Sequence, residues 1–411
     1  MLLFSRNRGT KIPEALKNRL DCGILLVNGR ICPWGKTQGG RKQMVTKQFQ
    51  NITLSRLGMG NMRLPILPGG KDGDIDFEKA GAILDYAMEN GINYYDSAYV
   101  YHSGRSEAFV GQALRKYPRD SYYITTKYNL RANPDYRETF AQQLERYGVD
   151  RIDFYLIHAL GDDSIDDYLN NGCIPFFQQM KREGKISYFG FSSHASPEVL
   201  ARFADANAWD FAQIQLNYFD WNYGTAKQEY EILAQRNIPV MVMESVRGGR
   251  LAKLTEEAEA LLRQAHPDWS IPSWAFRWLK RLPMVQVALS GMSTLEQIQD
   301  NVATFADDRA LTDEEEALLF RACAMFRDQV RTPCTGCRYC CDTCPAGINI
   351  PEVLKVYNAF KLEGSWALHG LQKVEGGMPW DCVGCGACEG HCPQNIRVPQ
   401  LMEEMAKAAG K

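Results

Sequence analysis

The 411-residue sequence predicts an α/β protein: a (β/α)8 TIM barrel followed by a smaller, mostly helical domain. Two observations support this prediction. Between residues 52 and 311, short β-like runs alternate with amphipathic helical stretches, and the eight such units match a barrel of eight parallel strands. Nine of the thirteen cysteines then lie between Cys334 and Cys392, which indicates a metal-binding region at the C-terminal end.

The expected elements follow from the spacing of apolar residues. Strands are expected at residues 54–60, 92–98, 121–127, 151–158, 186–193, 211–217, 239–245 and 285–291. Helices are expected at 77–90, 106–116, 136–147, 175–183, 197–206, 227–236 and 294–305, with further helical stretches before residue 281. A doubly wound sheet is the alternative, but it would carry a Gly-rich dinucleotide turn after its first strand. Residues 59–62 (MGNM) form no such turn.

Four segments are expected along the chain. Residues 1–43 lack apolar periodicity and are expected to be a disordered N-terminal extension. Residues 44–311 form the barrel, and a connecting helix is expected at 312–330, where acidic residues suit the positive end of the helix dipole. Residues 331–411 form the cysteine-rich domain.

Composition excludes several classes of protein. The net charge of −2 gives no overall attraction to nucleic acid or to anionic lipid. No apolar run reaches the roughly 18–20 residues of a transmembrane helix, and no apolar segment follows the basic N-terminus as in a secretory signal. We therefore expect a cytoplasmic protein with no membrane or nucleic-acid partner.

The C-terminal cysteines form an internal repeat with the pattern C-x2-C-x2-C-x3-C-P. Its two copies are offset by 48 residues: Cys334, Cys337, Cys340 and Cys344, then Cys382, Cys385, Cys388 and Cys392. In this pattern the first three thiolates hold one 4Fe–4S cluster, and the fourth, before proline, ligates the other cluster. Cluster one is therefore expected on Cys334, Cys337, Cys340 and Cys392, and cluster two on Cys382, Cys385, Cys388 and Cys344.

The alternative for these cysteines is structural zinc, which also uses paired C-x2-C motifs. Zinc has no use for the third cysteine or for the Cys-Pro pair. Cys341 breaks the spacing and is expected to be a spare thiol. The motif pair resembles the bacterial two-cluster ferredoxins, and its long helical insertion (353–363) is similar to the α-helical ferredoxin domains of respiratory enzymes.

Ionisable residues also end three successive barrel strands: Asp96, Lys127 and His158, with Tyr101 in the loop after Asp96. Barrel active sites form at the carboxyl ends of the strands, so these four should meet at one mouth. Tyr101 is expected to be a proton donor whose pKa the Lys127 ammonium lowers, with Asp96 holding that lysine. His158 can hydrogen-bond a carbonyl oxygen.

The segments NYYDSAYVY (93–101), ITTKYN (124–129), DFYLIHAL (153–160) and GRSEAFVGQAL (104–114) resemble the signatures of the aldo/keto reductase family. The resemblance covers roughly residues 52–310. It implies that Asp96, Tyr101, Lys127 and His158 are a catalytic tetrad and that a nicotinamide delivers hydride to a carbonyl. The sequence from Met44 is similar to the family's usual start, where a short hairpin closes the barrel floor.

The resemblance also implies a cofactor groove. Ser192 and Gln215 match positions that hold the nicotinamide amide, and Ser193 stands where the family often has Asn. The loop and helix that hold the adenosine are matched by Gly291, Ser293, Gln297, Asp300 and Asn301.

The groove departs from the family pattern at three positions. Ser293 replaces the usual Arg or Lys for the 2′-phosphate, so NAD(H) is expected to be preferred over NADP(H), or the preference to be weak. Met243 replaces the aromatic residue that stacks on the nicotinamide. Glu244 lies near the pyrophosphate position, and this carboxylate would repel phosphate unless it is paired with Arg247 or Arg250.

We therefore expect an iron–sulfur oxidoreductase of the aldo/keto reductase type, acting on a small carbonyl or alcohol substrate. The alternative is an electron-transfer module that docks to a partner reductase and keeps a vestigial barrel site. A hydride is two electrons, whereas each cubane passes one at a time. A flavin or a flavoprotein partner is expected to mediate, although the chain carries no distinct flavin motif.

Overall fold

The computed structural model describes residues 26–27, 30–31, 44–327, 331–363 and 365–411. The chain divides into two units, Met1–Gln43 and Met44–Lys411. In the first unit, β1 (Leu26–Val27) pairs antiparallel with β2 (Arg30–Ile31). Apart from these four residues, the expected disordered extension, with Cys22 and Cys32, lies outside the described residues.

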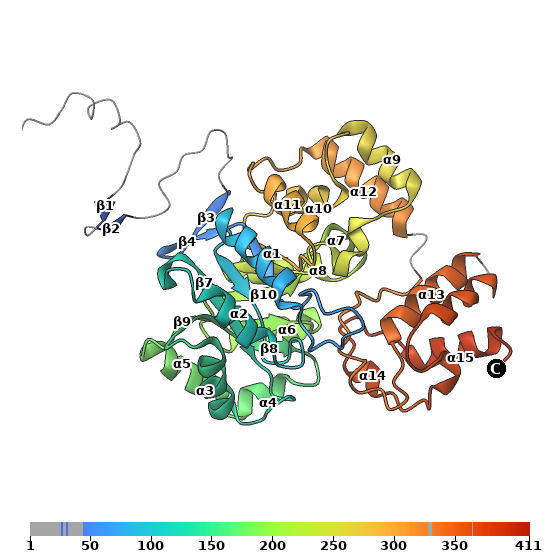
Figure 1. The fold of residues 1–411 in the computed structure, drawn as a ribbon, viewed down its shortest axis with the longest axis horizontal. Coiled ribbons are helices and arrows are strands. Elements are labelled where there is room, and N and C mark those ends of the chain that lie inside the picture. Colours follow the sequence, from blue (N-terminus) through green and yellow to red (C-terminus); the bar gives the residue numbers. More distant parts are fainter. Residues whose placement is uncertain (1–25, 28–29, 32–43, 328–330, 364) are drawn as a thin grey trace, which may run out of the picture. The chain divides into compact units, whose positions relative to one another are not determined.

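Eight parallel strands close into a barrel in the order β10-β11-β12-β5-β6-β7-β8-β9 (Figure 1). Their bounds are β5 (Leu57–Gly60), β6 (Tyr94–Asp96), β7 (Tyr123–Tyr128), β8 (Ile152–Leu160), β9 (Ile186–Ser193), β10 (Phe211–Gln215), β11 (Val240–Met243) and β12 (Val285–Ser290). The predicted barrel is confirmed, and the doubly wound alternative is wrong.

Helices surround the strands. They are α1 (Phe77–Glu89), α2 (Ser106–Leu114), α3 (Tyr136–Tyr147), α4 (Ile165–Asn170), α5 (Cys173–Arg182), α6 (Pro197–Asp205), α7 (Tyr218–Tyr223), α8 (Ala226–Gln235), α9 (Glu256–Ala265), α10 (Ile271–Leu279), α11 (Leu295–Thr304) and α12 (Asp313–Arg327). The sequence did not predict the short helices α4 and α7. Helix α12, expected as a connector, packs on α9 and places Leu319 and Cys323 in the barrel's core.

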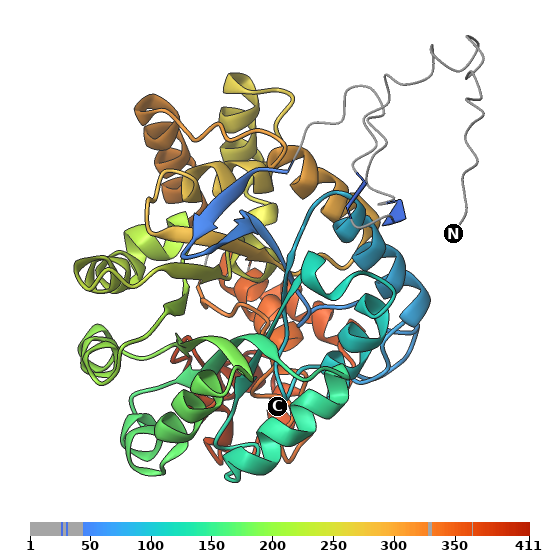
Figure 2. The ribbon, with the colours of Figure 1, turned by 90° about the vertical axis from the view of Figure 1, so that its left-hand side faces the viewer.

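The first expected strand, 54–60, is two strands. Residues 52–55 form β4 (Ile52–Ser55), which pairs antiparallel with β3 (Thr46–Phe49), and the barrel proper starts at β5. Phe49 and Leu54 of this hairpin pack on Phe154 inside the barrel. The hairpin therefore closes one end, as the blue arrows in Figure 2 show, and leaves the other end as the open mouth.

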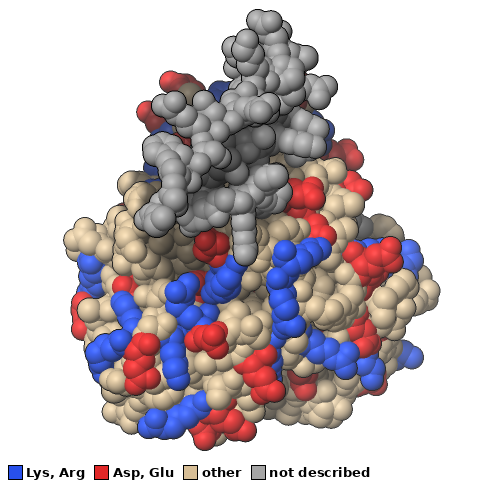
Figure 3. Space-filling view, turned by 60° about the vertical axis from the view of Figure 1, so that its left-hand side comes forward, with Lys and Arg blue, Asp and Glu red and all other residues tan. Residues whose placement is uncertain are grey.

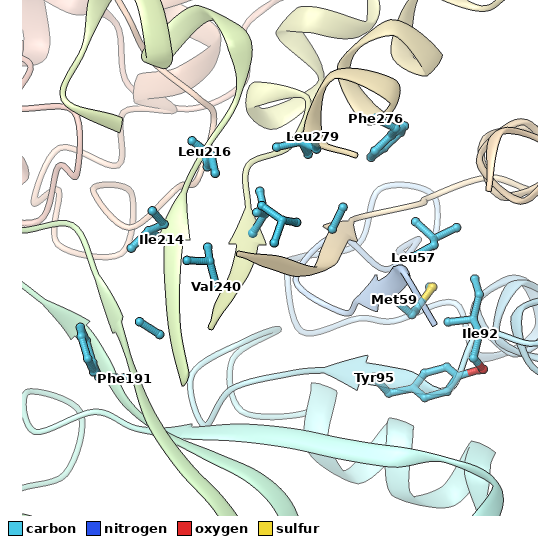
Figure 4. Close-up of a cluster of buried hydrophobic side chains, with 14 of the residues drawn as sticks. Leu57, Met59, Ile92, Tyr95, Phe191, Ile214, Leu216, Val240, Phe276 and Leu279 are labelled. Carbon is cyan, nitrogen blue, oxygen red and sulfur yellow. The ribbon is translucent and has the colours of Figure 1, made fainter. Parts of the chain in front are cut away.

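Apolar side chains on the outer face of the strands pack against the helices (Figure 4). Leu57, Met59 and Ile214 come from strands, and Phe276 and Leu279 from α10; all five are at most 1% exposed. Full burial of such side chains contributes roughly 1.5–3 kcal/mol each. This packing fixes the strands, and through them the positions of the residues at their carboxyl ends.

The C-terminal region has its own core. Its helices are α13 (Ile350–Glu363), α14 (Ala387–Gly390) and α15 (Val398–Ala408). The 48-residue repeat is visible here, because Ile350 and Val398 begin α13 and α15 and are both buried. Helix α13 begins three residues before the predicted stretch, 353–363.

The face of the molecule in Figure 3 carries Lys and Arg side chains interspersed with Asp and Glu, without a field of one sign. Among the described residues, no helix has the length and apolar character needed to cross a membrane.

Candidate active site and iron–sulfur centres

The structure brings the four predicted tetrad residues together at the open mouth. Asp96 ends β6, while Lys127 and His158 lie near the carboxyl ends of β7 and β8. These strands are adjacent and parallel, so their ends lie at one edge. Tyr101 follows β6 in a loop whose turns are held by Tyr101 N–H donating to the Ala98 carbonyl, 3.1 Å away.

Lys127 is the centre of the group. Its Nζ donates to Asp96 Oδ1 at 2.7 Å and to the Ser97 carbonyl at 2.6 Å, and it lies 4.9 Å from the centroid of the Tyr101 ring. Burial lowers the pKa of Lys127 and raises that of Asp96, while their mutual attraction opposes both shifts. The pair fixes the ammonium beneath the phenol, as expected from the sequence.

His158 faces Tyr101 edge to face, with 5.8 Å between the ring centroids. Burial, with the nearby Lys127 and His194, lowers the pKa of His158 well below its usual value, so the imidazole is neutral. A neutral imidazole can donate one hydrogen bond to a carbonyl oxygen. Its Nδ1 has no hydrogen-bond partner among the described residues.

The expectation that Lys127 lowers the pKa of Tyr101 is wrong in this structure. Burial raises the pKa of Tyr101 well above its usual value, and Tyr339, Asp96 and Glu244 add to the rise. Tyr339 belongs to the C-terminal domain and lies beside Tyr101, with which it lines one cavity. Such contacts favour the neutral phenol, which keeps Tyr101 a proton donor rather than a phenolate.

The residues expected to hold the nicotinamide amide have other partners. Ser192 Oγ accepts the N–H of Ala159 at 2.8 Å. Gln215 Nε2 donates to Asp220 at 2.7 Å, and Gln215 Oε1 accepts from Gln394 Nε2 of the C-terminal domain at 2.9 Å. Ser193, which stands where Asn is usual, is buried beside Ser192.

The residues expected at the adenosine end lie together after β12 and bond to one another or to nearby groups. Ser293 N–H donates to Gln297 Oε1 at 2.7 Å, and Ser293 Oγ donates to the Arg63 carbonyl at 2.6 Å. Asp300 accepts a hydrogen bond from Ser270 Oγ at 2.7 Å, and Asn301 Nδ2 donates to Ser290 Oγ at 3.0 Å. Gly291 packs beside the Arg63 side chain.

Glu244 follows β11 with a φ of 59°, in the left-handed region. Its carboxylate pairs with Arg63 at 3.4 Å, whereas Arg247 pairs with Asp220 at 3.0 Å and Arg250 donates to the Thr332 carbonyl at 3.4 Å. The expected pairing of Glu244 with Arg247 or Arg250 is therefore corrected: Arg63 is its hydrogen-bonding partner, and Arg247 acts only at longer range.

Three residues of the site were missed from the sequence: Arg63, Tyr339 and Gln394. Arg63 donates to the carbonyls of Thr335 and Gly336, both at 3.2 Å, and so joins the barrel to the first cysteine loop. The position of Tyr339 between two motif cysteines was a signal that could have been noticed. Spacing alone does not tell which of the intervening residues faces the barrel.

The eight motif cysteines gather in two sets of four, and the eight contain no disulfide. One cavity is lined by Cys334, Cys337, Cys340 and Cys392, and another by Cys382, Cys385, Cys388 and Cys344. These are the two crossed sets read from the sequence, and Cys341 lines neither cavity. No three His, Cys, Asp or Glu side chains of the described residues converge on a single ion. Four cysteines line each cavity, which is the number of thiolate ligands that a 4Fe–4S cluster takes.

Two further cavities lie where the barrel mouth meets the C-terminal domain. The larger, about 860 Å³, is lined by His158, Ser193 and Gln215 on the barrel side and by Tyr339 and Cys392 on the other. It has the size of a small-molecule site, roughly 300–1,000 Å³. The smaller, about 80 Å³, holds Asp96, Tyr101, Met243, Glu244 and Cys337. This volume is well below that of a small-molecule site, so the space beside Met243 and Glu244 does not fit a nicotinamide ring with the domain in this place.

Glu229 of α8 also lines the larger cavity. It is 8% exposed and accepts a hydrogen bond from Thr225 Oγ1 at 2.6 Å. Burial, with repulsion from Asp220, raises the pKa of Glu229 to about 7. The folded state therefore binds this proton more tightly than the unfolded chain, so stability falls as pH rises from the usual carboxyl pKa toward about 7.

We expect an infrared pH titration to show a protonated-carboxyl band that is lost with a midpoint near the pKa of about 7. Glu229→Gln should remove the band, because it removes the titrating group. Glu231→Gln, an exposed neighbour on the same helix, is the matched control and should leave the band in place. A band that persists in Glu229→Gln would show that another group titrates there.

Comparisons with known proteins agree with the geometry. The aldo/keto reductase family model matches residues 56–320, and a 4Fe-4S dicluster domain model matches residues 333–396. The uncharacterized oxidoreductase YqkF of Bacillus subtilis is 28% identical over 296 residues, which are 64% of this chain and 91% of that protein. The NADH-specific methylglyoxal reductase of Escherichia coli is 26% identical over 321 residues, 65% of this chain and 97% of the relative.

Among solved structures, the holo form of the aldo-keto reductase AKR11C1 from Bacillus halodurans has a TM-score of 0.57 and is 26% identical. The match covers 68% of this chain and 96% of that one, so it takes in the barrel and leaves the cysteine-rich domain without a counterpart. With the barrel, the tetrad residues at its mouth and the family match all in place, the chain belongs to the aldo/keto reductase family and carries a C-terminal 4Fe–4S dicluster domain.

Proposed function

We propose that this chain is an iron–sulfur oxidoreductase that interconverts a small carbonyl compound and its alcohol at the barrel mouth. The observation that carries the proposal is the meeting of Tyr101, Lys127, Asp96 and His158 directly beneath the cysteine-rich domain. The larger cavity next to His158 is the proposed substrate site, and its lining is rich in hydroxyl, carboxamide and carboxylate groups that can hydrogen-bond a polar small molecule.

In the proposed reduction, the two-electron donor supplies the electron pair and the hydrogen that form the new C–H bond, as a hydride, and Tyr101 donates the proton that the carbonyl oxygen takes up. Its raised pKa keeps the phenol protonated, and Lys127 lies close enough to stabilise the phenolate that remains after transfer. The neutral His158 donates a hydrogen bond to the same oxygen and so favours the build-up of negative charge there. Asp96 holds Lys127 in place through the 2.7 Å contact.

We propose two 4Fe–4S clusters as electron carriers, one on Cys334, Cys337, Cys340 and Cys392, and one on Cys382, Cys385, Cys388 and Cys344. When bound, each cluster supplies transfer of one electron at a time. The side chains of Arg250 and Arg63 reach the backbone of the cluster-one loop, where positive charge would offset the negative charge of a thiolate-bound cluster.

The proposed source of the electrons is a nicotinamide or a flavin. Family membership favours a nicotinamide, and one relative is an NADH-specific reductase by name. Ser293 supplies no charge for a 2′-phosphate, so NADH should be used at least as well as NADPH. Against a nicotinamide stands the narrow space left at Met243 and Glu244. A flavin or a flavoprotein partner remains the proposed link between a two-electron donor and the clusters.

The test is an anaerobic turnover assay on the protein with its clusters in place. Small aldehydes and ketones, methylglyoxal among them, are offered with NADH, NADPH or reduced methyl viologen as donor. We expect donor oxidation that depends on the carbonyl, with alcohol formed in equal amount. We also expect NADH to bleach the clusters only when free flavin is added, because a nicotinamide has no stable one-electron state.

The second candidate function is an electron-transfer module that docks to a partner reductase and keeps a vestigial barrel site. The narrow space at the nicotinamide position favours it. Absence of carbonyl-dependent turnover with every donor, in protein whose clusters still accept electrons from viologen, would decide for this candidate.

A further inference from the structure

The C-terminal domain reaches into the barrel mouth at the position that the family uses for the nicotinamide amide. Gln394 Nε2 donates to Gln215 Oε1 at 2.9 Å, and Gln215 Nε2 faces Gln394 Oε1 at 3.4 Å. A carboxamide offers one acceptor oxygen and an adjacent donor nitrogen. Gln394 thus presents to Gln215 the same pair of groups that a nicotinamide carboxamide would present.

A second contact is made at the proton donor. Tyr339 of the C-terminal domain lies beside Tyr101 in the small cavity, and Tyr101 is 8% exposed. Tyr101 lines the small cavity but not the large one, whereas Tyr339 lines both. Tyr339 therefore borders both cavities beside the proton donor.

A third contact crosses the rest of the groove. The Arg63 side chain packs on Gly291, where an added Cβ would meet it at 3.2 Å, and its guanidinium bonds to Glu244 and to the carbonyls of Thr335 and Gly336. A dinucleotide in the family position would have to displace this arginine and the loop that it holds.

The barrel backbone is shaped for this contact at Gly248. Its φ is 63°, and a Cβ built there would lie 1.8 Å from the carbonyl oxygen of Thr335. A Cβ cannot lie that close to an oxygen atom. Only glycine at position 248 therefore allows the Thr335 loop to take this position. The adjacent Gly249 has a φ of 89°, yet a Cβ there would meet nothing within 4 Å.

From these contacts we propose that the docked cluster domain and a nicotinamide dinucleotide compete for one position at the barrel mouth. Gln394 fills the place of the nicotinamide carboxamide, and Arg63 with the Thr335 loop that it holds fills the rest of the groove. The inference rests on the proposed function only in taking the barrel mouth as the active site. A nicotinamide can bind only when the cluster domain leaves the mouth, so the docked form cannot take up a hydride from it.

The two glycines provide the test. Gly248→Ala should push the Thr335 loop away from the barrel, whereas Gly249→Ala imposes the same kind of backbone strain without that clash. We expect NADH and NADPH, titrated anaerobically into the full chain with its clusters and followed by fluorescence, to bind Gly248→Ala at least about tenfold more tightly than wild type, because the competing docked state is lost. Gly249→Ala should bind like wild type.

A second pair of variants keeps the test independent of backbone strain. Gln394→Ala removes one competing hydrogen-bond pair and should tighten nicotinamide binding by about three- to tenfold. Gln372→Ala, an exposed glutamine of the same domain, should change nothing. Hydrogen exchange in residues 335–340 should rise when a nicotinamide binds to the wild-type chain.

Tight nicotinamide binding to wild type without that rise in exchange would overturn the competition. So would a failure of Gly248→Ala and Gln394→Ala to gain affinity over their controls. Neither result would contradict the proposed carbonyl reduction. That proposal is contradicted only if no donor supports carbonyl-dependent turnover.

Discussion

Tyr101→Phe is expected to lower the rate of carbonyl reduction by about 10²–10⁴-fold, the usual contribution of a positioned proton donor. The change removes one hydroxyl and keeps the ring that packs against His158 and Lys127. Cluster content should not change, because the clusters are held by cysteines and not by that hydroxyl. The measurement is anaerobic turnover, together with the iron content and the absorbance of the clusters.

The matched control is Tyr117→Phe, which removes a phenol that donates to Asp85 on the outside of the barrel, away from the mouth. It should leave turnover within about twofold of wild type. Since the pKa of Tyr101 is raised, the wild-type rate should not fall at the pH where an ordinary tyrosine ionises. Equal turnover in Tyr101→Phe and wild type would remove Tyr101 from the mechanism and favour the vestigial-site alternative.

The tetrad could be predicted because each member is tied to a strand end. Asp96, Lys127 and His158 follow apolar runs at the period of a strand, and the topology of a parallel barrel then brings those ends together. The cysteine sets could be predicted because the spacing of the ligands is itself set by the geometry of a cubane. In both cases a local pattern determines a position in space.

The pKa of Tyr101 could not be predicted in the same way. Burial raises this pKa most, and the next contribution comes from Tyr339, which is distant in the chain. Nothing in the C-x2-C-x2-C pattern marks Tyr339, Gln394 or the loop at Thr335 as facing the barrel. Contacts between two domains depend on how their surfaces dock, and periodicity carries no information about docking.

The start of the first barrel strand could not be predicted either, because it too depends on contacts that are distant in the chain. Residues 54–60 were predicted as one strand, but the chain bends at Arg56, so that Leu54 enters the barrel floor and Leu57 joins the barrel wall. Both positions are buried, so burial alone produces the same pattern in the sequence. Only the pairing of β3 with β4 distinguishes the hairpin from the wall.

The crossed arrangement of the cysteines gives the second large effect. Cys344→Ala is expected to lower the iron content from about eight to about four atoms per chain, because one cubane loses a ligand. The cluster that is lost should be the one on Cys382, Cys385 and Cys388, since Cys344 lines their cavity and not that of its nearer neighbours in sequence. Alkylation of the intact protein followed by mass spectrometry identifies which cysteines have become free.

The expected pattern in Cys344→Ala is labelling of Cys382, Cys385 and Cys388 with protection of the other set. Cys392→Ala should give the reverse pattern, because Cys392 completes the cavity around Cys334, Cys337 and Cys340. Cys341→Ala is the control: this thiol lines neither cavity, and both sets should stay protected at full iron content. Labelling of Cys334, Cys337 and Cys340 in Cys344→Ala would mean that each motif holds its own cluster. Cys344 would then complete the cluster beside Tyr339. Cys392, which lines the larger cavity, would ligate the other cluster instead.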